Sequence, residues 1–235
     1  MAFESGNYIT NEGLNFQVGT LPVQGGAFET ARFHRPFADG VVPVVISHVQ
    51  TTNDWPFVKT RNTNANENGF AVALEEIGDS AFCGASTPPA GNSATNYCGL
   101  GNPCQQNPAD CTGKDAPTPT YTHGTETVGW IAFEPGHGHL GTLQFEAMNT
   151  PEQVSEQPET VTFTHPFAQV PRFFGSIATH NGADASQLRL DDASPVTNTQ
   201  ATFYIEEEEC VDTERSPAAD GCTECESRKL KSLVF

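Results

Sequence analysis

The chain has 235 residues, of which 29 are Asp or Glu and 11 are Lys or Arg, so its formal net charge is −18. A field of this sign repels nucleic acids and anionic membrane surfaces, and we expect neither as a partner. No run of about 18 apolar residues occurs, so no membrane-spanning segment is expected. The acidic excess is typical of a solvated surface suited to a salty medium. We expect no cofactor, with calcium as the minority alternative.

An internal repeat begins near the N-terminus. Residues 3–37 and residues 133–167 have equal length, and their anchor residues match one for one. The anchors in the first copy are Phe3, Glu4, Gly6, Glu29, Thr30, Phe33, Pro36 and Phe37, and in the second Phe133, Glu134, Gly136, Glu159, Thr160, Phe163, Pro166 and Phe167. Because residues 2–6 (AFESG) match residues 132–136 (AFEPG), we interpret them as the tail of a further copy.

The repeat continues to the end of the chain, and it reads as β-structure throughout. Each copy contains about six short runs rich in β-branched and apolar residues, separated by turn signals. In the first copy we place strands at roughly 14–19, 27–35, 42–50, 56–63, 69–76 and 127–133, with counterparts in the second. The sequence therefore predicts an all-β protein of two tandem six-stranded antiparallel β-sandwich modules, residues 1–134 and 135–235.

The first copy carries a cysteine-rich insertion at about 78–123. Loops of this length are usually functional or disordered, and disulfides would order them. The seven cysteines all lie in loop-like segments and are disulfide candidates: Cys83, Cys98, Cys104, Cys111, Cys210, Cys222 and Cys225. By position we expect Cys83–Cys111, Cys98–Cys104, and Cys210 with either Cys222 or Cys225. A redox or zinc role for the C-x-x-C motif at 222–225 is the less favoured alternative.

Cysteine usage indicates an oxidising compartment. The N-terminus lacks the basic and apolar regions of a signal peptide. We therefore expect a mature or excised segment of a secreted precursor, located outside the cell or at its surface.

Candidate sites are few. No motif for a hydrolase, phosphate-binding loop or dinucleotide fold is present, so we expect no enzymatic activity. Four residues near the end of the first copy could ligate a metal, although loop polar residues are the favoured interpretation: His123, Glu126, His137 and His139. Asp54 and Trp55 could place an aromatic ring for sugar stacking, although a partly buried loop tryptophan is the favoured alternative.

The segments ARFHRPF, VPVVISHVQTTN, VKTRNTNANENGFAVAL and VGWIAFE together resemble the H-type lectin domain. The resemblance covers most of the first copy and, more faintly, the second. It implies a six-stranded antiparallel β-sandwich and binding of N-acetylgalactosamine-like sugars between subunits of a trimer. Arg61 and its counterpart Arg189 lie on the strand that carries the family's arginines, and both are candidate ligand-binding residues.

The family's three sugar-binding residue types are not retained. Its Arg, His and Asp fall at or near Phe57, Gly78 and Pro22 in the first copy, and at Ala185, Glu209 and Glu152 in the second. We therefore predict a structural or adhesive subunit of a surface filament or appendage that self-associates, with a head-to-tail contact as the specific hypothesis. The alternative is a lectin on the same scaffold.

Overall fold

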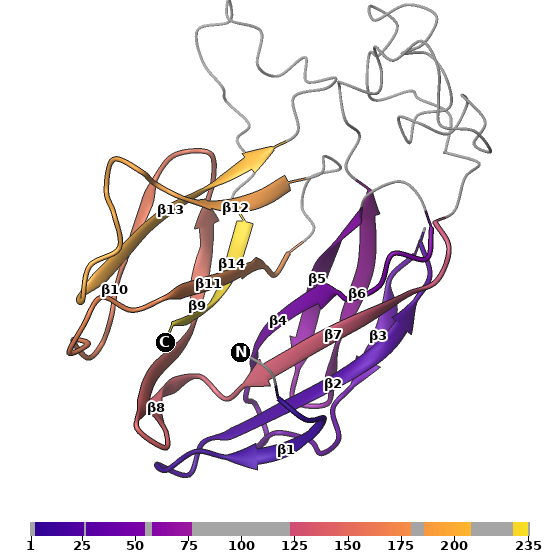
Figure 1. Cartoon of the computed structure of the whole chain (residues 1–235), viewed down its shortest axis with the longest axis horizontal. Coiled ribbons are helices and arrows are strands. Elements are labelled where there is room, and N and C mark those ends of the chain that lie inside the picture. Colours follow the sequence, from indigo (N-terminus) through magenta and orange to yellow (C-terminus); the bar gives the residue numbers. More distant parts are fainter. Residues whose placement is uncertain are drawn as a thin grey trace, which may run out of the picture.

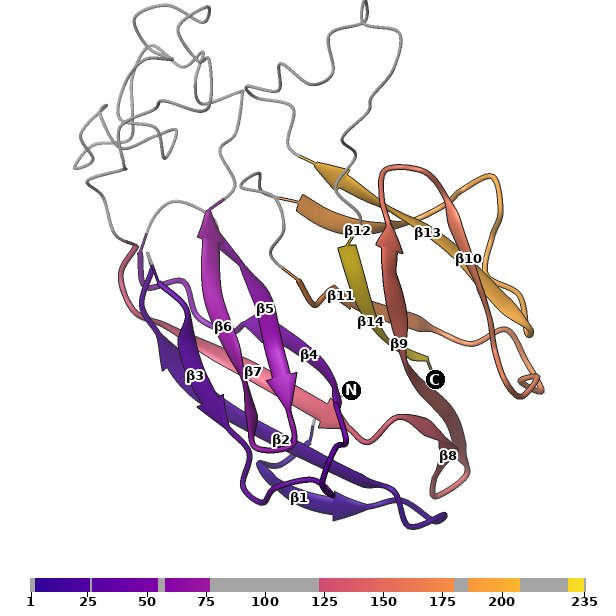
Figure 2. The same ribbon diagram turned by 180° about the vertical axis from the view of Figure 1, so that it is seen from behind.

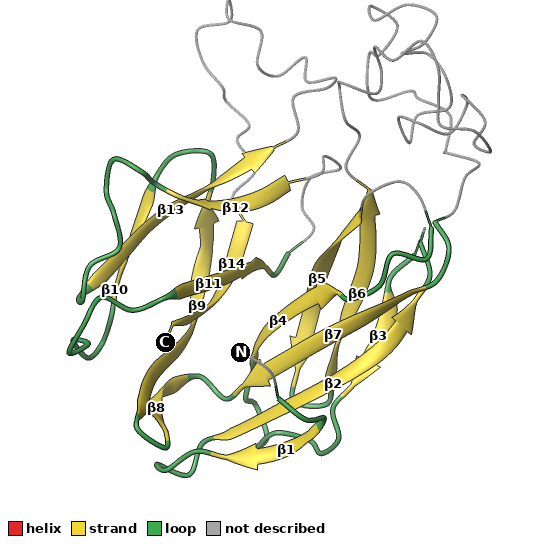
Figure 3. Cartoon of the chain, in the orientation of Figure 1, coloured by secondary structure: helices red, strands yellow, loops and turns green. Residues whose placement is uncertain are grey.

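The structure is a computed structural model that describes residues 3–25, 27–54, 58–76, 123–179, 186–207 and 228–234. The regular secondary structure of these residues is entirely β, with fourteen strands in four antiparallel sheets (Figure 3). The prediction of an all-β protein is confirmed. Within those ranges, no helix could cross a bilayer.

The first seven strands, which we call module 1, form two facing sheets (Figure 1). The four-stranded sheet has the order β1-β2-β7-β4 and the three-stranded sheet has the order β3-β6-β5. The strands are β1 (Gly6–Ile9), β2 (Asn15–Val23), β3 (Glu29–Arg32), β4 (Val44–Val49), β5 (Val58–Asn66), β6 (Gly69–Glu76) and β7 (Glu126–Phe133). Because side chains alternate along a strand, Val128, Trp130 and Ala132 of β7 share one face and pack against Phe33 and Phe70 in the core.

The remaining seven strands, module 2, repeat this order with every strand number raised by seven. The sheets are β8-β9-β14-β11 and β10-β13-β12. The strands are β8 (Gly136–Leu140), β9 (Leu143–Val154), β10 (Glu159–Thr162), β11 (Phe173–Ile177), β12 (Ser186–Leu190), β13 (Gln200–Glu207) and β14 (Arg228–Val234). The core includes Val154, Phe163 and Phe203.

Each set contains seven described strands, where the sequence predicts six. The additional strands are β1 and β8, whose sequences are GNYI and GHGHL; the first is only four residues long, and the second consists mostly of glycine and histidine. They form because each pairs antiparallel with the longer strand that follows it, β2 or β9. The six predicted strands of module 1 all correspond to observed strands, with ends that differ by a few residues.

A third apolar cluster joins the two modules. Phe133, at the end of β7, is fully buried between Phe16 of β2 and Phe145 of β9, with ring centroids 4.8 Å and 5.2 Å away. Val44 and Ala147 complete the buried part of this cluster. Alternation along β7 places Phe133 on the face opposite Trp130, so the outer face of the four-stranded sheet of module 1 is partly covered by module 2 (Figures 1 and 2).

The segment before β1 repeats the packing of the segment before β8. The ring of Phe3 lies 5.8 Å from that of Phe16 in an edge-on contact, and the ring of Phe133 lies 5.2 Å from that of the counterpart, Phe145, in a tilted contact. The sequence match between residues 2–6 and 132–136 is therefore accompanied by an equivalent aromatic contact. All seven cysteines and the predicted insertion, except for His123 at its end, lie outside the described residues.

Candidate functional site

The most elaborate polar site lies where module 1 meets module 2, around the buried side chain of Arg61 on β5. Only 2% of this residue is exposed. Its Nη2 donates to both carboxylate oxygens of Glu75 on β6, at 2.7 Å and 2.8 Å. The same nitrogen donates to the hydroxyl of Ser186 on β12 at 2.8 Å. A module 1 ion pair is thus completed by a residue of module 2.

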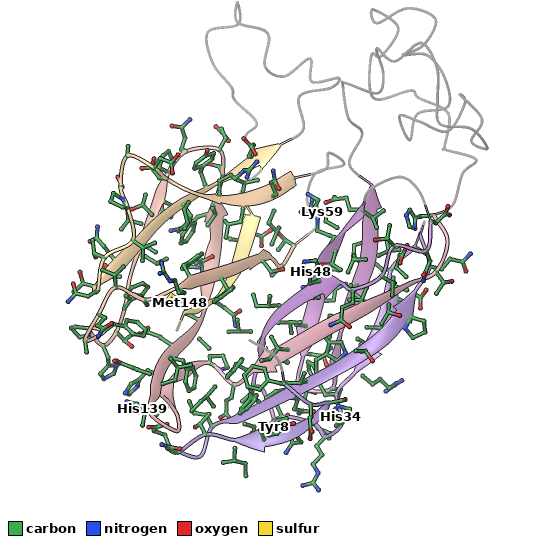
Figure 4. The ribbon with its side chains drawn as sticks, viewed as in Figure 1. Tyr8, His34, His48, Lys59, His139 and Met148 are labelled. Carbon is green, nitrogen blue, oxygen red and sulfur yellow. The ribbon has the colours of Figure 1, made fainter. Side chains whose placement is uncertain are left out.

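Lys59 strengthens this connection. Its Nζ lies 3.0 Å from the second carboxylate oxygen of Glu75, and it also donates to the main-chain carbonyl of Ser186. Figure 4 shows Lys59 and His48 on the side of module 1 that faces module 2. Two cations therefore share one carboxylate at the joint.

A second row of polar contacts runs beside the first. Ser47 donates its hydroxyl to the side-chain oxygen of Asn62 at 2.7 Å, and the Asn62 amide donates to Ser176 of β11 at 3.2 Å. Asn149 of β9 donates to the main-chain carbonyl of Val42 at 3.0 Å. Through these contacts and the phenylalanine cluster, the edge of module 1 that β4 and β5 form docks on the outer face of module 2.

Two buried polar atoms at this joint have no hydrogen-bond partner among the described residues: Nη1 of Arg61 and Oδ1 of Asn149. An unpaired buried polar atom costs about 1–3 kcal/mol. These two atoms therefore do not stabilise the joint, which is stabilised by its other contacts.

The strand register identifies the counterpart of this site in module 2. Arg61 is paired with Ala73, and Arg189 is paired with Tyr204 at the equivalent place. Arg189 Nε lies 2.5 Å from Glu206, which matches Glu75. Here, however, the side chains are 50% and 41% exposed. The same ion pair is thus covered by a following module in one case and open in the other.

A cavity of about 550 Å³ lies beside this open ion pair. We call it the edge cavity; its walls come from β11, β12 and β13 and include Phe173, Leu188, Arg189, Leu190, Tyr204 and Glu206. The aromatic ring of Tyr204 and the charges of Arg189 and Glu206 provide both a stacking surface and hydrogen-bonding groups.

A second hollow of about 490 Å³ lies over the outer face of the four-stranded sheet of module 1. We call it the sheet groove; it is lined by Val18, Thr20, Ile46, His48, Ile131 and, from module 2, Phe174. Thr20 and His48 are exposed. The groove is continuous with the apolar cluster at the joint, because Val18, Ile46 and Ile131 also contact that cluster.

Glu126, a predicted metal candidate, is instead a buried structural carboxylate. It accepts hydrogen bonds from the Thr51 hydroxyl at 2.5 Å and from the main-chain amides of Asn53 and Asp54 at 2.7 Å and 3.1 Å. Burial acts to raise its pKa, but these hydrogen bonds, together with nearby His123, bring the pKa below the ordinary glutamate value. Both carboxylate oxygens are therefore already engaged within the protein.

Asp54, a predicted ligand-binding residue, lies in the same loop. Its side chain accepts a hydrogen bond from the main-chain amide of Gly124 at 2.7 Å. This bond closes the chain segment before β7 onto the β4–β5 loop. Trp55, its predicted partner in sugar binding, lies outside the described residues.

The four metal candidates are not brought together. Glu126 begins β7, whereas His137 and His139 lie on β8, beyond the other end of that strand. His139 pairs with Glu12 at 2.8 Å, and His137 stacks on His165. In the part of the chain that the structure describes, no three His, Cys, Asp or Glu side chains could hold a metal ion.

Comparison with known proteins gives one informative match. The chain is 28% identical over 213 residues to halomucin of Haloquadratum walsbyi. The alignment covers 90% of this chain but spans only about 2% of the length of that protein. No family model matches the chain, and no solved structure matches it.

The polar joint was not predicted, although the sequence repeat contains the matched residues that form it. The matched pairs of Arg61 with Arg189 and of Glu75 with Glu206 were visible in the repeat. Only the strand register shows that each glutamate lies two residues from the partner of its arginine on the neighbouring strand, and only the packing shows that Ser186 covers one of the two pairs.

Proposed function

We propose that the chain is a non-enzymatic structural or adhesive subunit of an extracellular surface assembly. The observation that carries this proposal is the joint around Arg61 and Phe133, which docks one sandwich on the next through buried apolar and ionic contacts. A joint of this kind gives tandem modules a fixed mutual orientation. That property suits a building unit better than it suits a catalyst.

Two further observations support this role. The match to halomucin, a protein named as a mucin, covers nearly the whole chain, and we take an extracellular surface role from that name. The formal net charge of −18 suits a protein exposed to high salt, where an acidic surface stays solvated. We accordingly infer a location outside the cell or at its surface.

The resemblance to the H-type lectin domain belongs to this proposal as well. Two modules of that type, each a small antiparallel sandwich, are compatible with the described sheets. The lectin role is the second candidate function, and the edge cavity favours it, since Tyr204, Arg189 and Glu206 resemble the mixture of aromatic and charged groups that binds sugars. A bound glycan would then use Arg189, as the sequence suggests.

Electron microscopy of the purified chain at high and low salt tests the structural role. We expect filaments or sheets that grow with protein concentration. Discrete single particles at every concentration and salt would contradict it.

A glycan array tests the lectin role. The chain would be probed with and without calcium, alongside Arg189→Ala, Trp55→Ala and the exposed control Arg32→Ala. Glycan binding that is lost in Arg189→Ala or Trp55→Ala and kept in the control would favour the lectin.

A further inference from the structure

The joint between the modules consists of two unlike surfaces. Module 1 supplies an edge, made by Arg61, Asn62, Ile46 and the carbonyl of Val42. Module 2 supplies a face, whose Ser186, Ser176, Asn149 and Ala147 receive that edge. Because both modules have the same strand order and register, each also has an edge and a face at the positions that the other uses here, although most side chains there differ.

Module 2 has an edge equivalent to the one that module 1 buries against module 2. Strand pairing matches Phe174 to Ile46, and Leu190 to Asn62. These two residues are 49% and 42% exposed, and Val170, the counterpart of Val42, is 58% exposed. The open Arg189–Glu206 pair lies on the same edge. Three exposed apolar side chains and one open ion pair thus occupy positions that contribute to the joint in module 1.

Module 1 has a face equivalent to the one on module 2 that receives the edge of module 1. Strand pairing matches Thr20 to Asn149, and Val18 to Ala147. It also matches His48 to Ser176. All three residues of module 1 line the sheet groove. The groove is therefore the place where a preceding edge would dock; Phe174 of the same chain forms part of its lining, and its volume of about 490 Å³ leaves room for further side chains.

We propose that copies of this chain associate head to tail, with the β11–β12 edge of one copy docked in the sheet groove of the next. The contact uses the strand positions of the joint within the chain: Phe174 of one copy enters the groove of the next, beside that copy's Val18 and Phe174, and Thr20 takes the role of Asn149 toward the carbonyl of Val170. Val58 occupies the place of Ser186, so the hydrogen bond from Arg61 to Ser186 has no counterpart between copies, and apolar contacts carry the association. Because the two surfaces differ, the contact is heterologous and generates an open chain of copies unless the rotation closes a ring.

One residue difference between the two edges weakens the proposed contact. Arg172 occupies the place of Val44, which is fully buried in the joint within the chain. A charge at that place weakens the apolar centre, because burying it requires a partner. The contact between copies is therefore weaker than the joint within the chain, and association depends on protein concentration.

This inference rests on the proposed structural role and adds the surfaces through which copies make contact. The test must therefore separate failure of the proposed contact from failure of the structural role. Sedimentation velocity would be recorded over a wide concentration range at high salt for the wild-type chain and two variants. Thr20→Glu blocks the groove, and Val170→Glu places a charge on the exposed apolar edge. Thr30→Glu and Arg32→Glu place the same side chain at exposed positions of β3, on the other sheet of module 1. Circular dichroism checks that each variant is folded.

We expect the wild-type chain and both controls to form species larger than a monomer. Each of the two site variants should weaken association at least tenfold. Mixing them is the decisive step, because Val170→Glu retains an intact groove and Thr20→Glu retains an intact edge. The mixture should form dimers of one copy of each, and nothing longer.

Three results would overturn the inference. If the wild-type chain associates but neither variant weakens it, the contact lies elsewhere while the structural role survives. If the mixture fails to form dimers, the contact does not join unlike surfaces. If the wild-type chain stays monomeric throughout, both the contact and the structural role are contradicted. Glycan binding that Arg189→Ala abolishes without any change in association would assign the edge to a sugar.

Discussion

The two matched ion pairs allow a stability prediction in which each is the control of the other. Arg61→Ala and Arg189→Ala remove the same side chain from equivalent positions, each ion-paired with a glutamate on the neighbouring strand. The exposed fractions differ greatly, at 2% for the first arginine side chain and 50% for the second. Burial therefore decides how much each removal costs.

The magnitude follows from the surroundings of each pair. Removing one partner of a buried pair typically costs about 3–5 kcal/mol, because a buried charge is left behind. Lys59 remains 3.0 Å from Glu75, so we expect Arg61→Ala to lie at the lower end, near about 3 kcal/mol. An exposed pair contributes at most about 1 kcal/mol, so Arg189→Ala should cost less than that.

Urea unfolding followed by circular dichroism measures both losses. Because two modules need not unfold together, the midpoint and slope of each transition are fitted separately. The loss for Arg189→Ala should shrink further at high salt, since exposed charges are screened, whereas that for Arg61→Ala should persist. Equal losses for the two variants would refute the view that module 2 covers the Arg61 site.

Three further predictions concern single sites. Glu126→Gln should lower the free energy of unfolding at neutral pH by about 1–3 kcal/mol. Because the folded-state pKa of Glu126 is lowered, the stability that its carboxylate contributes is present above the ordinary pKa of 4.5 and is lost as the pH falls through the folded-state pKa. Acid unfolding of this variant should therefore depend less on pH than acid unfolding of the wild-type chain. Glu12 should titrate with a pKa of about 2 by NMR, because its carboxylate is hydrogen-bonded to the side chain and main-chain amide of His139, and His139→Asn should raise that pKa toward 4.5. Phe133→Ala should cost about 3–5 kcal/mol and separate the unfolding transitions of the two modules, because its ring is buried at their joint; unchanged transitions would contradict that position.

The parts of the fold that the sequence could predict are those encoded in local patterns. The alternation in GFAVALEE and the run VPVVISHVQ identify β6 and β4 directly. The strands β1 and β8 could not be found in this way, because β1 is too short to show an alternating pattern and β8 consists mostly of glycine and histidine; both become strands through pairing with β2 and β9.

The candidate site depends on contacts that are distant in sequence. Arg61 reads as a surface ligand residue because a strand arginine usually points to solvent, but Ser186 from the other module covers it. Similarly, Glu126 and His123 lie close to His137 and His139 in sequence, yet the length of β7 separates the two pairs. The repeat marks which residues are equivalent, and the packing decides which of them are buried.

Chemical crosslinking tests the central claim, that the surfaces joining the two modules are used again between copies. Within the chain, Asn149 contacts the carbonyl of Val42. Their counterparts are Thr20 and Val170, so Thr20→Cys chains mixed with Val170→Cys chains should be joined by a short bismaleimide reagent. Mass spectrometry should find the peptide linking positions 20 and 170, and a Thr30→Cys control should give no link to position 170. Equal linking from positions 20 and 30, or none from position 20 at concentrations where the chain assembles, would contradict the claim.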